Sequence, residues 1–275
     1  MFAPHLNPKK LWDLRTWGQP LLMLFLATLF AMPGCQDSQL KLHLANGSAE
    51  LEKRNFSLAE EHFSQALESN PGSVAALLGR GKAFEGQNEP LKAAEDYERA
   101  FKLQPEGGEA GYRLVNVLVE TGHGRTALEH FATMNPEPTM PDLLLLRGRA
   151  RLQADLDAAA QADFESVLDQ NAQNAAAHYY RGLAYAKLGK FPAAEADFTT
   201  ALNLDPANAK AYWQRGLIRE RRGEKDLATA DRTKAAELDP RLNFAETQIG
   251  KNMIENLTGQ GSEGLRLEPF TTDIR

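Results

Sequence analysis

The stretch AHYYRGLAYAKLGKFPAAEADFTTALNLDPAN, residues 177–208, contains the pattern that decides the fold of most of the chain. Its Ala194 has counterparts at a nearly constant interval along the 275 residues. The steps are 34, 34, 33, 34 and 34 residues, and the alanines are Ala59, Ala93, Ala127, Ala160, Ala194 and Ala228. Self-similarity at this period indicates a stack of repeated structural units, each of which contacts its neighbours.

Around each alanine the same residue types return at fixed offsets. An aromatic residue follows four positions later at Phe63, Tyr97, Phe131, Phe164 and Phe198, and a small or apolar residue three beyond it at Ala66, Ala100, Met134, Val167, Ala201 and Ala235. Offsets of 0, 4 and 7 share one helical face. Glycine stands twelve residues before the alanine at Gly47, Gly81, Gly148, Gly182 and Gly216, which predicts a closely approaching preceding helix. Gly122, Gly189 and Gly223 are expected in the turns between helices, where a positive φ is needed.

This pattern resembles the tetratricopeptide repeat (TPR), and residues 78–84, LGRGKAF, match it as well as residues 177–208 do. The resemblance implies an all-α fold, a right-handed superhelical solenoid of six antiparallel helix pairs plus a C-terminal capping helix. The expected units cover residues 40–73, 74–107, 108–140, 141–174, 175–208 and 209–242. The apolar residues of the segment 243–257 predict the capping helix, and Gly, Ser and Thr indicate a flexible tail at 258–275.

Two units depart from the pattern. The third has Val115 in place of glycine, and its junction with the fourth, MNPEPTMP at 134–141, contains three prolines. Because proline disfavours helix, we expect an irregular joint there. In the sixth unit Arg232 replaces the aromatic residue, which predicts weaker packing.

The N-terminal 34 residues read as a secretory signal. Basic residues precede an apolar run of twelve residues at 21–32, too short for a comfortable membrane span and typical of a signal core. The run ends in MPGC, which resembles a bacterial lipobox and implies cleavage after Gly34 and lipidation of Cys35, the only cysteine. Residues 35–39 would then form a tether, and by the sorting rule of the lipoproteins that this segment resembles, Gln36 implies the outer membrane, facing the periplasm. The alternatives are an ordinary secretory signal or an uncleaved anchor.

Arginine and aspartate vary together within the units. Arginine precedes the repeat glycine in four units, and aspartate follows sixteen residues later each time, giving Arg80 with Asp96, Arg147 with Asp163, Arg181 with Asp197, and Arg215 with Asp231. The two other units lack both residues and have His62 and His130 at the aspartate position. We therefore expect a structural Arg–Asp pair between the two helices of each of these four units.

The sequence contains no pattern typical of catalysis or of metal binding. Its six histidines do not form a ligand spacing, and no nucleophile elbow, Walker or dinucleotide motif is present. His43 and His178 are expected to pack against neighbouring residues. The formal net charge of -6 disfavours nucleic acid as a partner. We expect no enzymatic activity, no cofactor and no metal.

The candidate binding surface is the groove that the first helix of each unit lines in TPR arrays. The resemblance places these residues in that groove: Lys82, Tyr112, Asn116, Arg149, Tyr179, Leu183, Trp213 and Leu217. Aromatic and cationic side chains are typical of interface hot spots. The alternative is that Tyr179 and Trp213 only pack against neighbouring units. The Lys, Asn and Arg set with which some TPR proteins grip a peptide carboxyl terminus is not reproduced.

These features predict a non-enzymatic scaffold or adaptor lipoprotein of the bacterial cell envelope, attached to the membrane through its N-terminal lipid and holding a protein or peptide in the groove. The alternatives are a regulatory subunit of an envelope enzyme, secretion or assembly complex, and a self-associating structural protein. The sequence does not identify the partner or the oligomeric state.

Overall fold

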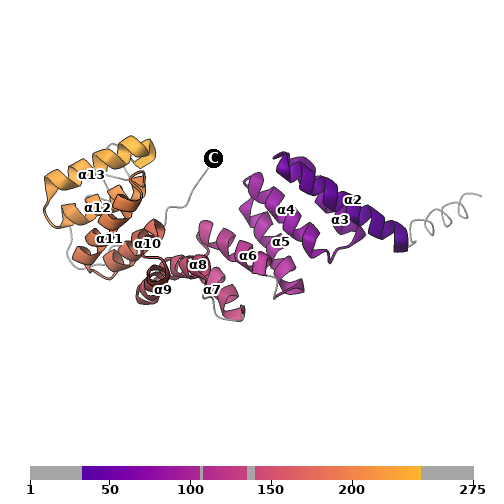
Figure 1. Ribbon diagram of the computed structural model, residues 1–275, viewed down its shortest axis with the longest axis horizontal. Helices are drawn as coiled ribbons and strands as arrows, with labels where there is room; N and C mark the ends of the chain where they lie inside the picture. The colour runs from indigo at the N-terminus through magenta and orange to yellow at the C-terminus, as the bar shows by residue number, and fades with distance from the viewer. Residues whose placement is uncertain (1–32, 106–107, 135–139, 243–275) are drawn as a thin grey trace, which may run out of the picture. The chain divides into compact units, whose positions relative to one another are not determined.

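The structure is a computed structural model that describes residues 33–105, 108–134 and 140–242 (Figure 1). Almost all of the predicted signal segment, the predicted capping helix and the predicted tail lie outside the described residues, as do the prolines at 136 and 138. The described residues form twelve α-helices and one short 3-10 helix, and they contain no strand. The expected all-α class is therefore confirmed.

The helices fall into two compact units, divided after Leu103. The first unit contains α2 (Pro33–Glu52), α3 (Phe56–Ser69), α4 (Val74–Gly86) and α5 (Pro90–Leu103). The second unit contains α6 (Gly108–Glu120), α7 (Gly124–Thr133), α8 (Pro141–Gln153), α9 (Asp157–Gln170), α10 (Ala175–Lys187), α11 (Phe191–Leu204), α12 (Ala209–Arg221), α13 (Lys225–Leu238) and the 3-10 helix η1 (Pro240–Leu242). Within each unit every helix contacts the next one along the chain, as in a stack of helix pairs.

The turns inside the helix pairs share one backbone conformation. Gly122, Gly189 and Gly223 have φ values of 81°, 73° and 82°, which confirms the predicted positive φ. The three other turns have it too, although they contain Arg54, Asn88 and Asp155, with φ values of 61°, 61° and 59°. Side chains with a Cβ enter this region at a cost, so the geometry of the pair, and not the local residue, determines the turn.

The repeat glycines allow an aromatic ring to lie directly against the preceding helix. A Cβ at Gly182 would stand 2.8 Å from Cε1 of Phe198, and one at Gly47 would stand 2.8 Å from Cζ of Phe63. The rings of Tyr97 and Phe164 press on Gly81 and Gly148 in the same way. These aromatic side chains are almost fully buried, so the glycine and the ring together form the core of a helix pair.

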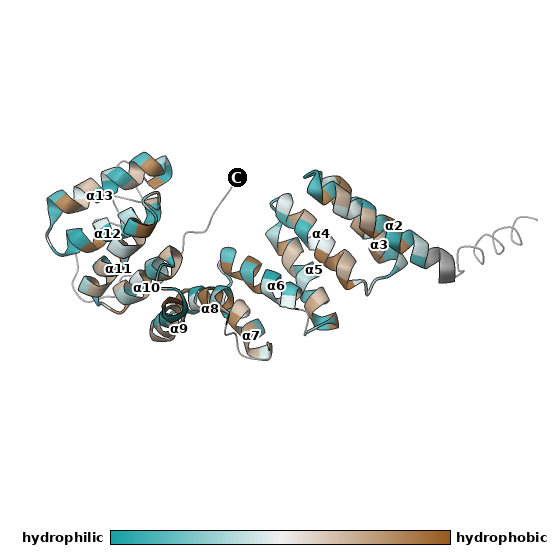
Figure 2. Cartoon of the chain, in the orientation of Figure 1, coloured by the Kyte–Doolittle hydropathy of each residue, from teal (hydrophilic) through white to brown (hydrophobic). Residues whose placement is uncertain are grey.

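The helices are mixed in hydropathy, with hydrophilic and hydrophobic residues interspersed along each of them (Figure 2). No helix in the described part of the chain combines the length and the apolar character needed to span a bilayer.

Candidate functional site

Four aspartates are buried between the paired helices, and each one bonds to the arginine sixteen residues before it. Arg80 donates from Nε to Asp96 Oδ2 at 2.7 Å and from Nη2 to Asp96 Oδ1 at 2.8 Å. Equivalent contacts join Arg147 to Asp163, Arg181 to Asp197, and Arg215 to Asp231. The hydrogen bond to Asp96 raises the pKa of Arg80, so the guanidinium remains charged. Two-pronged geometry of this kind fixes the relative position of two helices.

Each of these aspartates has a second basic partner that the sequence pattern did not reveal, which for Asp96 is Arg99 at 3.7 Å. Arg151 reaches Asp163 at 2.7 Å, and Arg219 reaches Asp231 at 2.9 Å. Both arginines stand four residues after the pairing arginine and hence on the same helical face, a spacing that could have predicted them. At Asp197 the second partner is Nδ1 of His178, at 3.0 Å.

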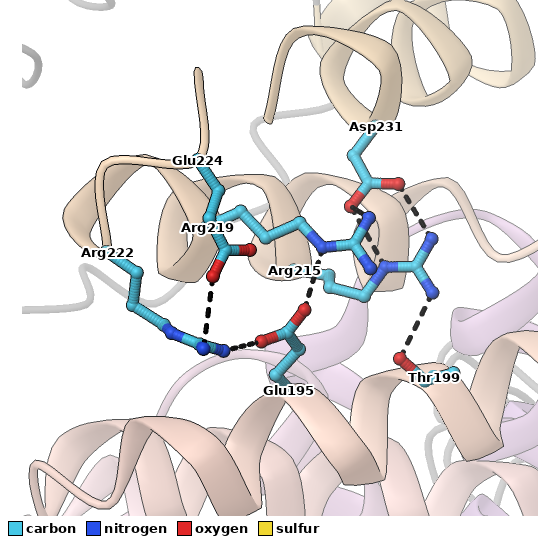
Figure 3. Close-up of polar contacts among 7 residues, drawn as sticks. All are labelled: Glu195, Thr199, Arg215, Arg219, Arg222, Glu224 and Asp231. Carbon is cyan, nitrogen blue, oxygen red and sulfur yellow. Dashed lines mark hydrogen bonds and ion pairs between the residues drawn. The ribbon is translucent and has the colours of Figure 1, made fainter. Parts of the chain in front are cut away.

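The contacts of the last two helix pairs form one polar network (Figure 3). Arg215 donates from Nη1 to Thr199 Oγ1 on α11 at 3.2 Å, in addition to binding Asp231 on α13. Arg219 donates from Nε to Glu195 on α11 at 2.8 Å, and Arg222 contacts both Glu195 and Glu224. The network therefore joins α11, α12 and α13. Each positive charge in the network has a negative partner within it, as is typical of ion pairs that stabilise the packing of helices.

The described histidines do not gather into a metal centre. His43 and His62 pack with ring centroids 5.8 Å apart, and His178 lies between Asp197 and the carbonyl of Ala172. In the described ranges no group of three His, Cys, Asp or Glu side chains is placed to hold a metal ion.

The predicted groove residues differ widely in burial. Tyr179 and Trp213 are only 9% and 7% exposed. Tyr179 packs against Tyr180 and Phe198, and burial raises its pKa. Trp213 packs with Ala235 and Leu242. Both rings are therefore part of the core, which is the alternative that the sequence left open. Little of either ring is accessible to a partner.

The remaining predicted groove residues are accessible to a partner. Lys82 is half-buried on α4 of the first unit. In the second unit Tyr112 on α6 is 40% exposed. Asn116, Arg149, Leu183 and Leu217 are half-buried and occupy equivalent positions on α6, α8, α10 and α12. We call the surface formed by Tyr112, Asn116, Arg149, Leu183 and Leu217 the first-helix face.

Arg149 is held in place at the middle of the first-helix face. Its Nη2 donates to Glu120 Oε1 on α6 at 2.8 Å, and its guanidinium carbon lies 5.1 Å from the centroid of the Tyr180 ring on α10. The Arg149 side chain is 18% exposed, whereas that of Glu120 is 58% exposed. A cation that is held in place beside an aromatic ring can bind a partner.

Comparison with known proteins supports the repeat pattern directly. Tetratricopeptide repeat family models match residues 44–108 and residues 175–208. The small glutamine-rich tetratricopeptide repeat-containing protein 2 of Mycosarcoma maydis is 29% identical over 87 residues, which are 32% of this chain and 25% of that protein. The chain thus spans a quarter or less of the length of the curated relatives that it matches.

Solved structures share the fold at low sequence identity. A tetratricopeptide repeat protein from Parabacteroides merdae is 18% identical, with a TM-score of 0.65 over 82% of this chain and 94% of its own. YrrB, a TPR protein described as having an unusual peptide-binding site, is 19% identical, with a TM-score of 0.50 over 70% of this chain and 97% of its own. Residues 44–108 and 175–208 therefore carry tetratricopeptide repeats, and the solved structures have the same fold.

Proposed function

We propose that this protein is a non-enzymatic scaffold that binds an extended segment of a partner protein on the first-helix face. The observation that carries the proposal is the row of half-buried side chains at equivalent positions on four successive first helices, Asn116, Arg149, Leu183 and Leu217. Such a row offers apolar area, hydrogen-bonding groups and one anchored cation along a single line. These are the ingredients of a protein interface with a few dominant contacts.

The known relatives support this class of function. TPR folds typically bind other proteins and lack catalytic groups of their own, and YrrB is described as having a peptide-binding site. In the described residues the strongest polar clusters are the Arg–Asp pairs, which are buried between helices. The side chains of the first-helix face are not taken up by these pairs.

We further propose that the scaffold is attached to the bacterial cell envelope through lipid on Cys35, at the outer membrane and facing the periplasm. The support comes from the sequence, in which a basic start, a twelve-residue apolar run and Gly34-Cys35 follow in the order of a lipoprotein signal. A lipid anchor would place the repeats at the membrane surface without a membrane-spanning helix.

Site-specific crosslinking tests the binding face. A photo-crosslinking residue at position 112 or 183 of the full chain in membranes should capture a defined partner, and Tyr112→Ala should weaken that crosslink from position 183. The matched control is Leu227→Ala on α13, because Leu227 is a similarly exposed apolar residue on a second helix. Equal partner yields in both variants would contradict the assignment of the face.

Membrane fractionation tests the anchor. Cys35→Ser should release the protein from the membrane pellet into the soluble fraction, and metabolic labelling with a fatty acid should mark only the chain that retains Cys35. A Cys35→Ser chain that stays in the pellet would favour an uncleaved anchor.

A further inference from the structure

The Glu120–Arg149 ion pair is asymmetric in a way that points to recognition. Arg149 is three times less exposed than Glu120 and is supported from the other side by the Tyr180 ring. Only its Nη2 donates to Glu120, so the other N–H groups of the guanidinium are not used by this pair. The arginine is therefore fixed by packing, and the glutamate is an exposed, easily replaced companion.

Other polar groups of the face are also unused. In the described part of the chain the Asn116 amide makes no side-chain hydrogen bond, although the residue is only half-exposed. An amide at this position can bond both to N–H and to C=O groups of an extended backbone. Toward α12 the face continues with Leu183 and Leu217, which are apolar and half-buried.

The spacing of the helices gives the register of a ligand. Helix α8 contacts α6 on one side and α10 on the other, and α10 contacts α12. Packed helices lie about 8–10 Å apart. An extended chain advances about 3.3 Å per residue, so one step between first helices corresponds to about three residues of a bound peptide.

We propose that the first-helix face recognises an extended peptide with an acidic side chain at Arg149 and an apolar side chain three residues away at Leu183. This inference rests on the proposed function and names the class of partner. The partner's carboxylate binds the N–H groups of Arg149 that Glu120 leaves unused, and Asn116 bonds to the peptide backbone on the far side of the acid. Glu120 is the resident competitor, because its charge repels the incoming carboxylate and occupies one prong of the guanidinium.

A random heptapeptide library selected on the full chain tests this register. Wild-type protein should enrich Asp or Glu with an apolar residue three positions away, and Arg149→Gln should lose the acid while keeping the apolar preference. Arg149→Lys retains the charge without the planar guanidinium and should bind the selected acidic peptide with intermediate affinity. A thermal melt of each variant checks that the helices remain folded.

Glu120→Gln provides the second arm of the test. An exposed ion pair contributes about 0.2–1 kcal/mol, so removal of Glu120 should tighten binding of the selected acidic peptide by about 1.4- to fivefold. The matched control is Glu237→Gln on α13, because Glu237 is 59% exposed and pairs with Lys234. This control should leave the affinity unchanged.

The outcomes separate this inference from the broader function. Peptides that bind without acid enrichment, or acid enrichment that survives Arg149→Gln, would overturn the acidic register while leaving peptide binding intact. Equal effects of Glu120→Gln and Glu237→Gln on the affinity for the acidic peptide would also overturn it. If no peptide is selected, or if the face proves to join two copies of the chain in a dimer that Arg149→Gln dissociates, the proposed function fails together with the inference.

Discussion

The fifth helix pair, α10 and α11, and the sixth, α12 and α13, have the same backbone plan and fill it with different chemistry. In the fifth pair the Phe198 ring lies against Gly182 and is fully buried. In the sixth pair Arg232 occupies the ring's position, and a Cβ at Gly216 would meet its neighbours only at 3.3 Å or more. The sixth pair is therefore less closely packed at the point where the fifth is most closely packed.

The same exchange occurs on the first helices. Tyr185 stands on α10 where Arg219 stands on α12, four residues after the pairing arginine. Arg181 lies over the Tyr185 ring at 5.7 Å, whereas Arg219 binds Asp231 and Glu195. The comparison teaches that one helix-pair geometry can be stabilised either by apolar burial or by a charge network. The two terms respond differently to mutation, pH and salt.

The largest expected difference is between Phe198, the buried ring of the fifth pair, and Arg232, which stands at the equivalent position in the sixth pair. Phe198→Ala should lower the free energy of unfolding by about 3–5 kcal/mol, because it leaves a cavity in a close-packed core. Arg232→Ala should cost under about 1 kcal/mol, because it removes only a partly exposed ion pair with Glu220. Urea unfolding followed by circular dichroism measures both. Similar losses in the two variants would mean that the sixth pair is as closely packed as the fifth.

The next difference concerns the buried aspartates. Asp231→Asn should cost about 3 kcal/mol, since it removes the carboxylate that lies between two largely buried guanidinium groups and leaves Arg215 without an ion-pair partner. Asp197→Asn should cost about 1 kcal/mol less, because Asp197 binds one guanidinium, that of Arg181, and an imidazole, whereas Asp231 binds two guanidinium groups. Thermal unfolding of the two variants at pH 7.5 makes the comparison, and a reversed order would contradict it.

Alkaline pH should distinguish Tyr179 from Trp213, which occupies the same position in the sixth pair. Burial raises the pKa of Tyr179, so above about pH 10 the unfolded chain loses this proton while the folded chain keeps it. The contribution of Tyr179 to the free energy of unfolding is therefore fully present below about pH 10. Above that pH it falls by up to about 1.4 kcal/mol per pH unit. Tyr179→Phe should reduce that slope between pH 10 and pH 11.5. An unchanged slope would show that Tyr179 ionises freely in the folded state.

The smallest expected effect is that of salt. Raising NaCl from 0.05 to 1 M should destabilise the sixth pair by a few tenths of a kcal/mol, because Arg222 and Glu224 are exposed enough to be screened. Glu195→Gln should remove part of this salt dependence, and Phe198→Ala should not change it. Hydrogen exchange of the α13 amides, measured at the two salt concentrations, reports the stability of the sixth pair separately from that of the other pairs.

The periodic sequence predicted the helix pairs because glycine, alanine and aromatic residues recur at positions where backbone approach leaves few alternatives. It also placed Arg80 opposite Asp96, since a residue pair that is present or absent together identifies a contact. It did not reveal the left-handed turns at Arg54 and Asp155, where the pair geometry outweighs local preference. It also left the burial of Tyr179 and Trp213 open, because accessibility depends on how the neighbouring unit packs. Glu120 and Arg149 belong to two neighbouring helix pairs, so the comparison of residues within one helix pair could not predict their contact.

The tie of Arg215 to both Thr199 and Asp231 bears on how the array unfolds. In a linear array, stability is divided between the intrinsic stability of each unit and the coupling between neighbours. Arg215, Arg219 and Glu195 contribute to the coupling between the fifth and sixth pairs, so ionic strength acts on cooperativity itself. At low salt the last pair should melt together with its neighbour, whereas at high salt it should fray first and separately.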